Sequence, residues 1–168
     1  NQDQGYATTV HMPATDPESD PITYTRNGGT CSGWASVNGA GTISGIPLAG
    51  DAGSCTVIVR ASANGGNDDA TVTINVIANQ PPGFSLASYT AANAVADNAY
   101  NTTVHMPAVD PEGDSITYSR NGGTCSGWAS VSGAGTISGT PAGGDVGTCT
   151  VIVQATATGG NDNATVTI

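Results

Sequence analysis

The 168-residue chain repeats itself: a shift of 94 positions aligns the sequence with itself without a gap. Residues 6–74 align with residues 100–168, and the run RNGGTCSGWASV occurs at 26–37 and again at 120–131. A period of this length is too long for one turn of a solenoid, whereas it suits a β-sandwich of roughly 100 residues. We therefore expect two domains of one kind, residues 1–78 and residues 79–168.

Apolar side chains recur at every second position in several segments of each copy, as they do in a β-strand with one buried face. Residues 149–155 and 164–168 show this alternation clearly. Pro, Gly, Asn and Asp fill the segments between, as turns require. No segment has a helical period. The chain is predicted to be all-β, with two tandem β-sandwiches.

The two copies are cut out of phase. Residues 81–94 open the second copy and have no counterpart in the first, whereas residues 75–77 extend the first copy past the point where the second one stops. Alternation over residues 84–89 predicts an opening edge strand, which repeat 1 lacks. The chain is then either a window on a longer array or a subunit whose vacant edge receives a strand from a neighbouring copy in a head-to-tail filament.

The four cysteines form two equivalent pairs, each 24 positions apart: Cys31 with Cys55, and Cys125 with Cys149. We expect one disulfide in each domain. Zinc binding is the alternative, but structural zinc sites favour closely spaced cysteine pairs with further Cys or His ligands nearby. Disulfides persist in oxidising compartments, so the protein is expected to be extracellular or at the cell surface.

Trp34 and Trp128 follow the first cysteine of each copy, and His11 and His105 lie on a predicted strand. A tryptophan in this position either packs on the disulfide or offers an exposed platform for a sugar ring. The histidines fall in the outward register of their strand. No nucleophile motif such as G-x-S-x-G occurs. We expect no enzymatic activity.

The formal net charge is −10, and the only basic residues are Arg26, Arg60 and Arg120. Three scattered arginines cannot form the basic footprint that a duplex or an anionic membrane requires. No apolar run approaches the ~18 residues of a membrane span. Nucleic-acid binding and membrane insertion are therefore not expected.

Three acidic residues lie within five positions in each copy, in Asp16-Pro17-Glu18-Ser19-Asp20 and in Asp110-Pro111-Glu112-Gly113-Asp114. Carboxylates so close together repel one another, and a bound cation would remove this cost. Oxygen ligands at alternating positions suit Ca²⁺, which accepts about six to eight donors. The alternative is a solvated acidic turn that aids solubility.

The run DPEGDSITYS, followed by GWASV, GTISGTP, GDVGTCTVIVQATATGG and ATVTI, resembles the dystroglycan-type cadherin-like and Ig-like repeat modules of bacterial or archaeal surface proteins. The likeness covers nearly all of both copies. Residues 79–84, Asn-Gln-Pro-Pro-Gly-Phe, are similar to the Asn-x-Pro-Pro-x-Phe seam that joins such modules. The resemblance implies two tandem Ig-like/cadherin-like sandwiches.

The resemblance also implies that the acidic loop supplies calcium ligands at a module junction, where it would face Asn79 and Gln80. Family members often place an Asp after the VIVQAT strand, where this chain has Ala157 and Ala63. Asp162 and Asp68 follow a few residues later and could substitute for it. The expected ligands, repeat 2 first, are Asp110, Glu112, Asp114, Asp162 and Asn79, and then Asp16, Glu18, Asp20 and Asp68.

These features favour a structural or adhesive repeat of a surface adhesin, stalk or extracellular filament, since an array multiplies reach and avidity. Neighbouring copies of the same module are its expected partners. The alternative is a carbohydrate-binding accessory module of a secreted polysaccharide-degrading enzyme, with surface glycans as ligands. Asn101 and Asn163 each begin a glycosylation sequon, although both lie on predicted strands.

Overall fold

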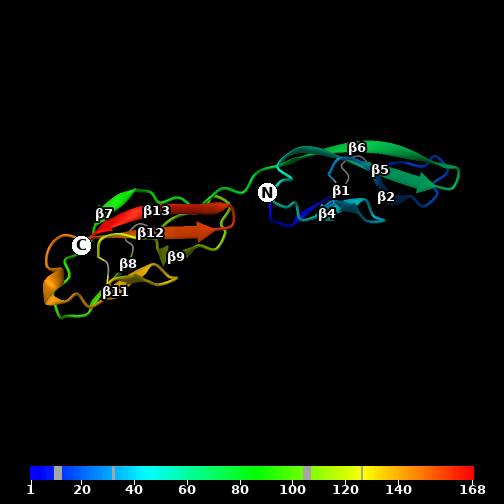
Figure 1. Cartoon of the computed structure of the whole chain (residues 1–168). Helices are drawn as coiled ribbons and strands as arrows, with labels where there is room; N and C mark the ends of the chain where they lie inside the picture. The colour runs from blue at the N-terminus through cyan, green and yellow to red at the C-terminus, as the bar shows by residue number, and fades with distance from the viewer. Residues whose placement is uncertain (10–12, 32, 104–106, 126) are drawn as a thin grey trace. The chain divides into compact units, whose positions relative to one another are not determined.

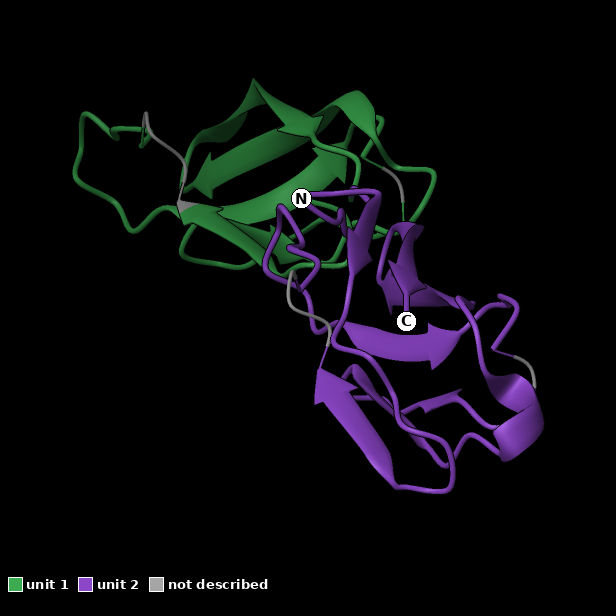
Figure 2. Cartoon of the chain, turned by 90° about the vertical axis from the view of Figure 1, so that its left-hand side faces the viewer, with its two compact units in different colours: residues 1–79 green, residues 80–168 purple. Residues whose placement is uncertain are grey.

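A computed structural model of the chain describes residues 1–168 except 10–12, 32, 104–106 and 126. The chain forms two compact units, Asn1–Asn79 (unit 1) and Gln80–Ile168 (unit 2) (Figures 1 and 2). Each unit is built from β-strands, as the period-two alternation predicted. The two histidines singled out in the sequence, His11 and His105, lie outside the described residues.

Unit 1 consists of two three-stranded antiparallel sheets. One has the order β1-β4-β3 and is formed by β1 (Tyr6–Thr9), β4 (Thr42–Gly45) and β3 (Ser36–Val37). The other has the order β2-β5-β6 and is formed by β2 (Thr23–Gly28), β5 (Gly53–Ala63) and β6 (Gly66–Val76). Within the described part of unit 1, no strand pairs with the outer edge of β6.

Unit 2 repeats this plan with one strand more. Its first sheet has the order β10-β11-β8, from β10 (Ser130–Val131), β11 (Thr136–Gly139) and β8 (Tyr100–Thr103). Its second has the order β7-β13-β12-β9, from β7 (Ser88–Thr90), β13 (Gly160–Thr167), β12 (Thr150–Ala157) and β9 (Thr117–Arg120). A single 3₁₀ turn, Gly143–Asp145, precedes β12.

The additional strand β7 pairs in parallel with β13, with Ser88 opposite Thr165. It is shorter than the edge strand that the alternation of residues 84–89 predicted. Pro81 and Pro82 precede it and have no N–H to donate. Before β7 the chain forms an isolated β-bridge, in which Gly83 and Val109 exchange two hydrogen bonds of 2.9 Å.

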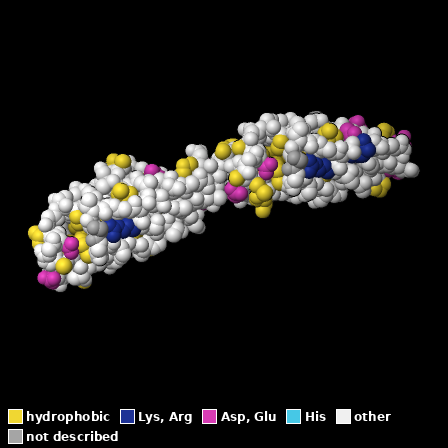
Figure 3. Space-filling model, in the orientation of Figure 1, with side chains coloured by type: hydrophobic (Ala, Val, Ile, Leu, Met, Phe, Trp, Pro, Cys, Tyr) yellow, Lys and Arg dark blue, Asp and Glu magenta, His cyan; other side chains and the backbone are white. Residues whose placement is uncertain are grey.

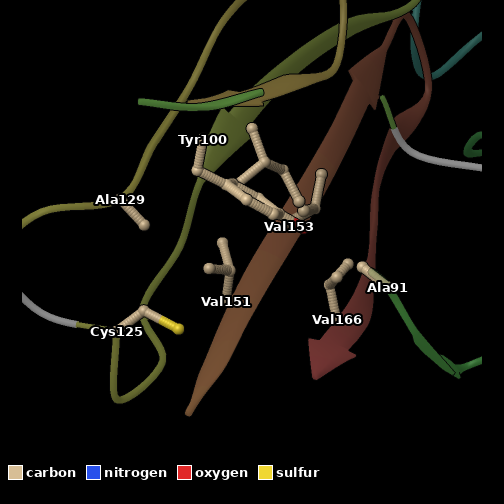
Figure 4. Packing of buried hydrophobic residues seen from close by; sticks show 8 residues of the cluster. Ala91, Tyr100, Cys125, Ala129, Val151, Val153 and Val166 are labelled. Carbon is tan, nitrogen blue, oxygen red and sulfur yellow. The ribbon is translucent and has the colours of Figure 1, made fainter. Parts of the chain in front are cut away.

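Each unit has its own core between its two sheets. In unit 2, Val151, Val153 and Ala155 of β12 are fully buried, as the alternation predicted. Figure 4 shows the side chains of Tyr100, Val151 and Val153 converging, with the Cys125 sulfur directed toward them. The equivalent cluster of unit 1 contains Ile43, Val57, Val59 and Ile74. Burial of each such aliphatic side chain stabilises the fold by about 1.5–3 kcal/mol.

Both disulfides form within copies, Cys31–Cys55 and Cys125–Cys149, each with 5.0 Å between the Cα atoms. The first cysteine of each pair is almost fully buried. In unit 1 the bond joins the loop after β2 to Cys55 of β5, and in unit 2 it joins the loop after β9 to Cys149, which directly precedes β12. The loop that leads from one sheet toward the other is thereby fixed next to the core.

All three arginines are used by the fold. Arg26 donates to the carbonyls of Gly28, Ala35 and Cys31. In unit 2, Arg120 donates to the carbonyls of Gly122, Ala129 and Gly123. Arg60 forms an ion pair of 2.8 Å with Asp69, the one acidic residue without an acidic counterpart in the other copy. On the face drawn in Figure 3 the basic side chains appear as small separate patches.

Replacing Cys125 and Cys149 together by alanine should lower the free energy of unfolding of unit 2 by about 3.5 kcal/mol, because the open chain regains loop entropy. Trp128 fluorescence during urea denaturation measures this in a Trp34→Phe background, where only unit 2 carries a tryptophan. The matched double replacement of Cys31 and Cys55 should leave the Trp128 transition in place. A decrease in the free energy of unfolding below about 1 kcal/mol would contradict a major stabilising role of the disulfide.

Candidate functional site

The acidic loop of each unit is organised around its first aspartate. Asp110 Oδ1 accepts hydrogen bonds of 3.0 Å from the backbone N–H groups of Glu112 and Asp114. Asp16 Oδ1 accepts equivalent 3.0 Å bonds from Glu18 and Asp20. One carboxylate oxygen therefore fixes the loop, which brings the second and third acidic residues back toward the first. These local bonds have the pattern of an Asx turn.

The fourth position of the loop requires a left-handed backbone. Gly113 has φ +81°, and Ser19 at the equivalent position has φ +65°. Glycine adopts this conformation without steric cost, whereas a residue with a Cβ pays roughly 1–2 kcal/mol. The loop of unit 1 is therefore held in the same shape at a higher local cost.

A tyrosine hydroxyl anchors the start of each loop. Tyr118 of β9 accepts a 3.0 Å hydrogen bond from the N–H of Ala108, and Tyr24 of β2 accepts the same bond from Ala14. Sequence reasoning did not assign this role. The fixed spacing in DPEGDSITY, with the tyrosine eight positions after the first aspartate, is the signal that could have shown it.

In unit 2 the segment 80–84 lies along this loop. The N–H of Gln80 donates to Glu112 Oε2 at 3.1 Å, and the N–H of Phe84 donates to Asp162 Oδ2 at 2.9 Å. Pro82 is fully buried, and the Phe84 ring packs on Tyr118 with 6.2 Å between centroids. The structure thus brings Asp110, Glu112 and Asp162 to one seam of unit 2.

The second carboxylate oxygen of Asp110, Oδ2, is the feature of this seam that points to a ligand. Asp110 is 6% exposed, and its Oδ2 accepts no hydrogen bond from any described residue. A buried carboxylate oxygen without a donor is costly, and a cation would remove the cost. The chemistry of the seam therefore fits a hard cation at Asp110. The fit is incomplete, because no three Asp, Glu, His or Cys residues among those described converge on one point that could hold a metal.

The other predicted ligands, Asn79 and the acidic residues of unit 1, do not belong to the seam of unit 2. Asn79 belongs to unit 1, where its N–H donates to Gln2 Oε1 at 3.1 Å. In unit 1, Asp68 is exposed and its Oδ1 accepts from the N–H of Asp69. Asp16 and Asp20 are half-buried, and Glu18 is exposed. The equivalent aspartate is thus more deeply buried in unit 2 than in unit 1.

Both tryptophans are half-buried and pack against the core cluster that contains the disulfide of their unit. Trp128 makes an edge-to-face contact with Tyr100, with 5.8 Å between ring centroids, and Trp34 makes the same contact with Tyr6. These contacts favour a packing role over a sugar platform. Trp128 also lines a cavity of about 550 Å³ at the end of unit 2 that carries the 3₁₀ turn.

Both sequon asparagines are exposed and lie on strands, Asn101 in β8 and Asn163 in β13. The side-chain oxygen of Asn163 accepts a 3.0 Å hydrogen bond from Asn121. Asn101 lies opposite Ser138 of β11. Each asparagine backbone is therefore held in an extended ladder, and no glycan attachment is inferred from these positions.

The fold and the disulfides define a class of protein: an Ig-like β-sandwich repeat in two tandem copies. The chain belongs to the family described as "Putative Ig domain", which matches residues 1–77 and again residues 83–168. The resemblance seen in the sequence is thereby confirmed. A search of curated proteins found no match.

Several solved structures are similar in fold. The endo-fucoidan hydrolase MfFcnA4 of glycoside hydrolase family 107 is 23% identical, with a TM-score of 0.48 over 98% of this chain and 25% of that one. Mouse protocadherin-24 EC1-3 is 20% identical, with a TM-score of 0.44 over 88% and 58%. Drosophila N-cadherin EC1-3 is 19% identical, with a TM-score of 0.43 over 91% and 55%. The chain spans about a quarter of the hydrolase chain.

Disulfides and an Ig-like fold are typical of extracellular domains. No helix in the described ranges is long and apolar enough to span a membrane.

The left-handed backbone at positions 19 and 113 predicts that exchanging serine and glycine there changes the stability of the two units in opposite directions. Ser19→Gly should raise the free energy of unfolding of unit 1 by about 0.5–1 kcal/mol, and Gly113→Ser should lower that of unit 2 by a similar amount. Urea denaturation measures both, with Trp34 as the reporter in a Trp128→Phe background and Trp128 in the converse one. Shifts of the same sign in both units would contradict the proposed backbone cost.

Proposed function

We propose that this chain is a non-catalytic structural or adhesive repeat of an extracellular or cell-surface protein, and that Ca²⁺ binds at the acidic loop of unit 2. The observation that supports the calcium part is the buried Asp110 Oδ2 without a donor, at the seam where segment 80–84 meets the loop. Two nearly identical, separately cross-linked units suit a load-bearing or multivalent array better than a catalyst.

The proposed role of the ion is to fasten the seam. Asp110 and Glu112 are the expected side-chain ligands. Asp114, in the same loop, and Asp162, which accepts from segment 80–84, are the expected additional carboxylates. Calcium would neutralise the mutual repulsion of these carboxylates. Because Glu112 also accepts from Gln80, an ion at the loop would hold segment 80–84 more firmly. Such an effect stiffens the start of the module.

Calcium should therefore stabilise unit 2. At ~10 mM Ca²⁺ and a dissociation constant of ~1 mM, typical of extracellular modules, mass action predicts a gain of about 1.4 kcal/mol. Thermal and urea unfolding followed by Trp128 fluorescence in the Trp34→Phe background measure it, with chelator as the reference. KCl at matched ionic strength separates binding from screening.

Asp110→Asn should abolish this gain. The amide oxygen still accepts the two loop hydrogen bonds, so the loop keeps its shape while the charge is lost. The matched control is Asp145→Asn in the 3₁₀ turn, which removes one carboxylate from another part of unit 2 and should leave the gain intact. Equal unfolding midpoints in calcium and in chelator, or a full gain in Asp110→Asn, would reject the calcium proposal.

A carbohydrate-binding role is the second candidate, and the cavity beside Trp128 supports it. The cavity is also lined by Val146 and Asn93, and Val146 is one of the most exposed apolar side chains. Affinity electrophoresis through gels containing soluble polysaccharides tests this role. Retardation that disappears in Trp128→Ala would favour it, and unchanged mobility in every gel would argue against it.

A further inference from the structure

We propose that the outward surface of the larger sheet of unit 2 binds a neutral polysaccharide through a set of amide and hydroxyl side chains, which we name the amide face. Strands β9, β12 and β13 lie side by side in this sheet (Figure 1). The inference rests on the proposed adhesive role and names the class of its ligand, and it does not depend on calcium. The amide face consists of Ser119, Asn121, Gln154, Thr156, Asn161 and Asn163.

The side chains of the amide face point away from the core of unit 2. Val153 of β12 is fully buried, so the next residue, Gln154, points to the other side of the sheet. Gln154 lies opposite Asn163 of β13 and opposite Ser119 of β9. Residues opposite each other in paired strands project from the same side of a sheet. Gln154 is half-buried, and the other members of the face are exposed.

Hydrogen bonds between side chains hold the amides of this face in place. Asn121 Nδ2 donates to Asn163 Oδ1 at 3.0 Å, and Gln154 Nε2 donates to Asn161 Oδ1 at 3.2 Å. A side chain that is already held loses less rotamer freedom when a ligand binds, so this pairing lowers the entropic cost of binding. A primary amide has two N–H donors and an acceptor oxygen, so one such bond uses only part of its capacity.

The amide face is neutral although the protein is strongly acidic. The chain has a formal net charge of −10, but none of the six side chains of the face ionises. An anionic partner would be repelled by the chain as a whole. A cationic partner would find no carboxylate among the members of the face. The charges therefore favour a neutral partner.

The chemistry of the face favours a polysaccharide over a protein as that partner. The buried centres of protein interfaces are rich in Tyr, Trp, Phe, Met and Arg, and the face contains none of these. Amides and hydroxyls both donate and accept hydrogen bonds, as sugar hydroxyls do. Neighbouring strands lie about 4.8 Å apart, which is close to the length of one sugar unit in an extended polysaccharide. A polysaccharide that lies across the strands would meet an amide or hydroxyl at each strand.

Unit 1 has a charged pair at the centre of the equivalent surface. Arg60 and Asp69 are paired in the register that Gln154 and Asn163 have in unit 2. The Asp69 carboxylate accepts hydrogen bonds of 2.9 and 2.8 Å from Arg60 and of 3.0 Å from Asn27. A neutral ligand that covered this pair would remove two charges from water, which is costly. The proposed site therefore belongs to unit 2.

Affinity electrophoresis of the full chain in chelator tests the proposal. Hydroxyethyl cellulose, galactomannan, xylan and dextran are the neutral probes, each in its own native gel, and alginate is the anionic one. We expect retardation in at least one neutral gel and none in alginate. An oligosaccharide of the retarding polymer should shift the side-chain amide NMR signals of Asn121, Gln154 and Asn163, and not that of Asn27. No retardation in any neutral gel would overturn the proposal.

Replacing Asn121 and Gln154 together by alanine should weaken the affinity about tenfold or more, because both amides lose their hydrogen bonds to the ligand. The matched control replaces Asn27 and Asn67, the asparagines of the equivalent surface of unit 1, by alanine and should keep the affinity. Neither change alters the net charge, so the mobility in a gel without polysaccharide is the reference. Unfolding midpoints show whether each variant is folded. Equal affinity of the two double variants would contradict the proposed site.

The charged pair of unit 1 allows a gain-of-function experiment. Arg60→Gln combined with Asp69→Asn gives unit 1 the same central amides as unit 2. This double variant should acquire a second site, so that the molar ratio of bound oligosaccharide to chain doubles in titration calorimetry. An unchanged ratio would show that these amides do not define the site.

Trp128→Ala separates the amide face from the cavity beside Trp128. If retardation is lost in Trp128→Ala but kept in the Asn121 and Gln154 variant, the cavity is the sugar site and the amide-face proposal fails. If the reverse is found, the amide-face proposal stands. Calcium binding is measured by unfolding in the absence of polysaccharide. A calcium gain without retardation in any neutral gel would therefore reject the amide face alone.

Discussion

The disulfide within each copy is the constraint on which the rest of the unit depends. The cores are made largely of valine, alanine and isoleucine, with a few aromatic rings at their margins. Such cores bury little apolar area per residue, and a covalent cross-link offsets part of the entropy that folding costs. Arg120 reinforces the same region, because its guanidinium donates to the carbonyls of Gly122, Gly123 and Ala129, which lie on either side of Cys125 in the chain. Tyr100 and Trp128 then pack beside it.

The acidic loop is a second organised element, and one aspartate has two tasks in it. Asp110 Oδ1 orders the loop backbone, while Oδ2 faces a buried environment. Segment 80–84 covers this loop in unit 2 and ties it to the β12–β13 hairpin through Asp162. The same covering segment accounts for the burial of the Asp110 carboxylate. The structural contrast between the units therefore has a single physical origin.

The sequence was sufficient to predict the fold, but not the contrast between the units. Alternation identified the buried faces of β12 and β13, and the matched cysteine pairs identified the cross-links. The alternation of residues 84–89 predicted too long an edge strand, since regular pairing with β13 begins only at Ser88. The acidic residues of the two loops are the same, so the loop sequence alone does not predict that one loop is more buried than the other. Burial depends on which segment packs over each loop. Whether carboxylates converge on an ion likewise depends on side-chain placement, which spacing alone does not define.

The ion pair between Arg60 and Asp69 has a consequence for how near-identical neighbours fold correctly. Adjacent repeats of similar sequence are prone to exchange elements during folding. Arg60 and Asp69 face each other across β5 and β6, whereas Gln154 and Asn163 hold the equivalent positions of β12 and β13. A chain that paired β5 with β13 would set Arg60 against an amide and leave Asp69 without its cation. This divergence favours pairing within each copy only slightly, because an ion pair exposed to solvent contributes little.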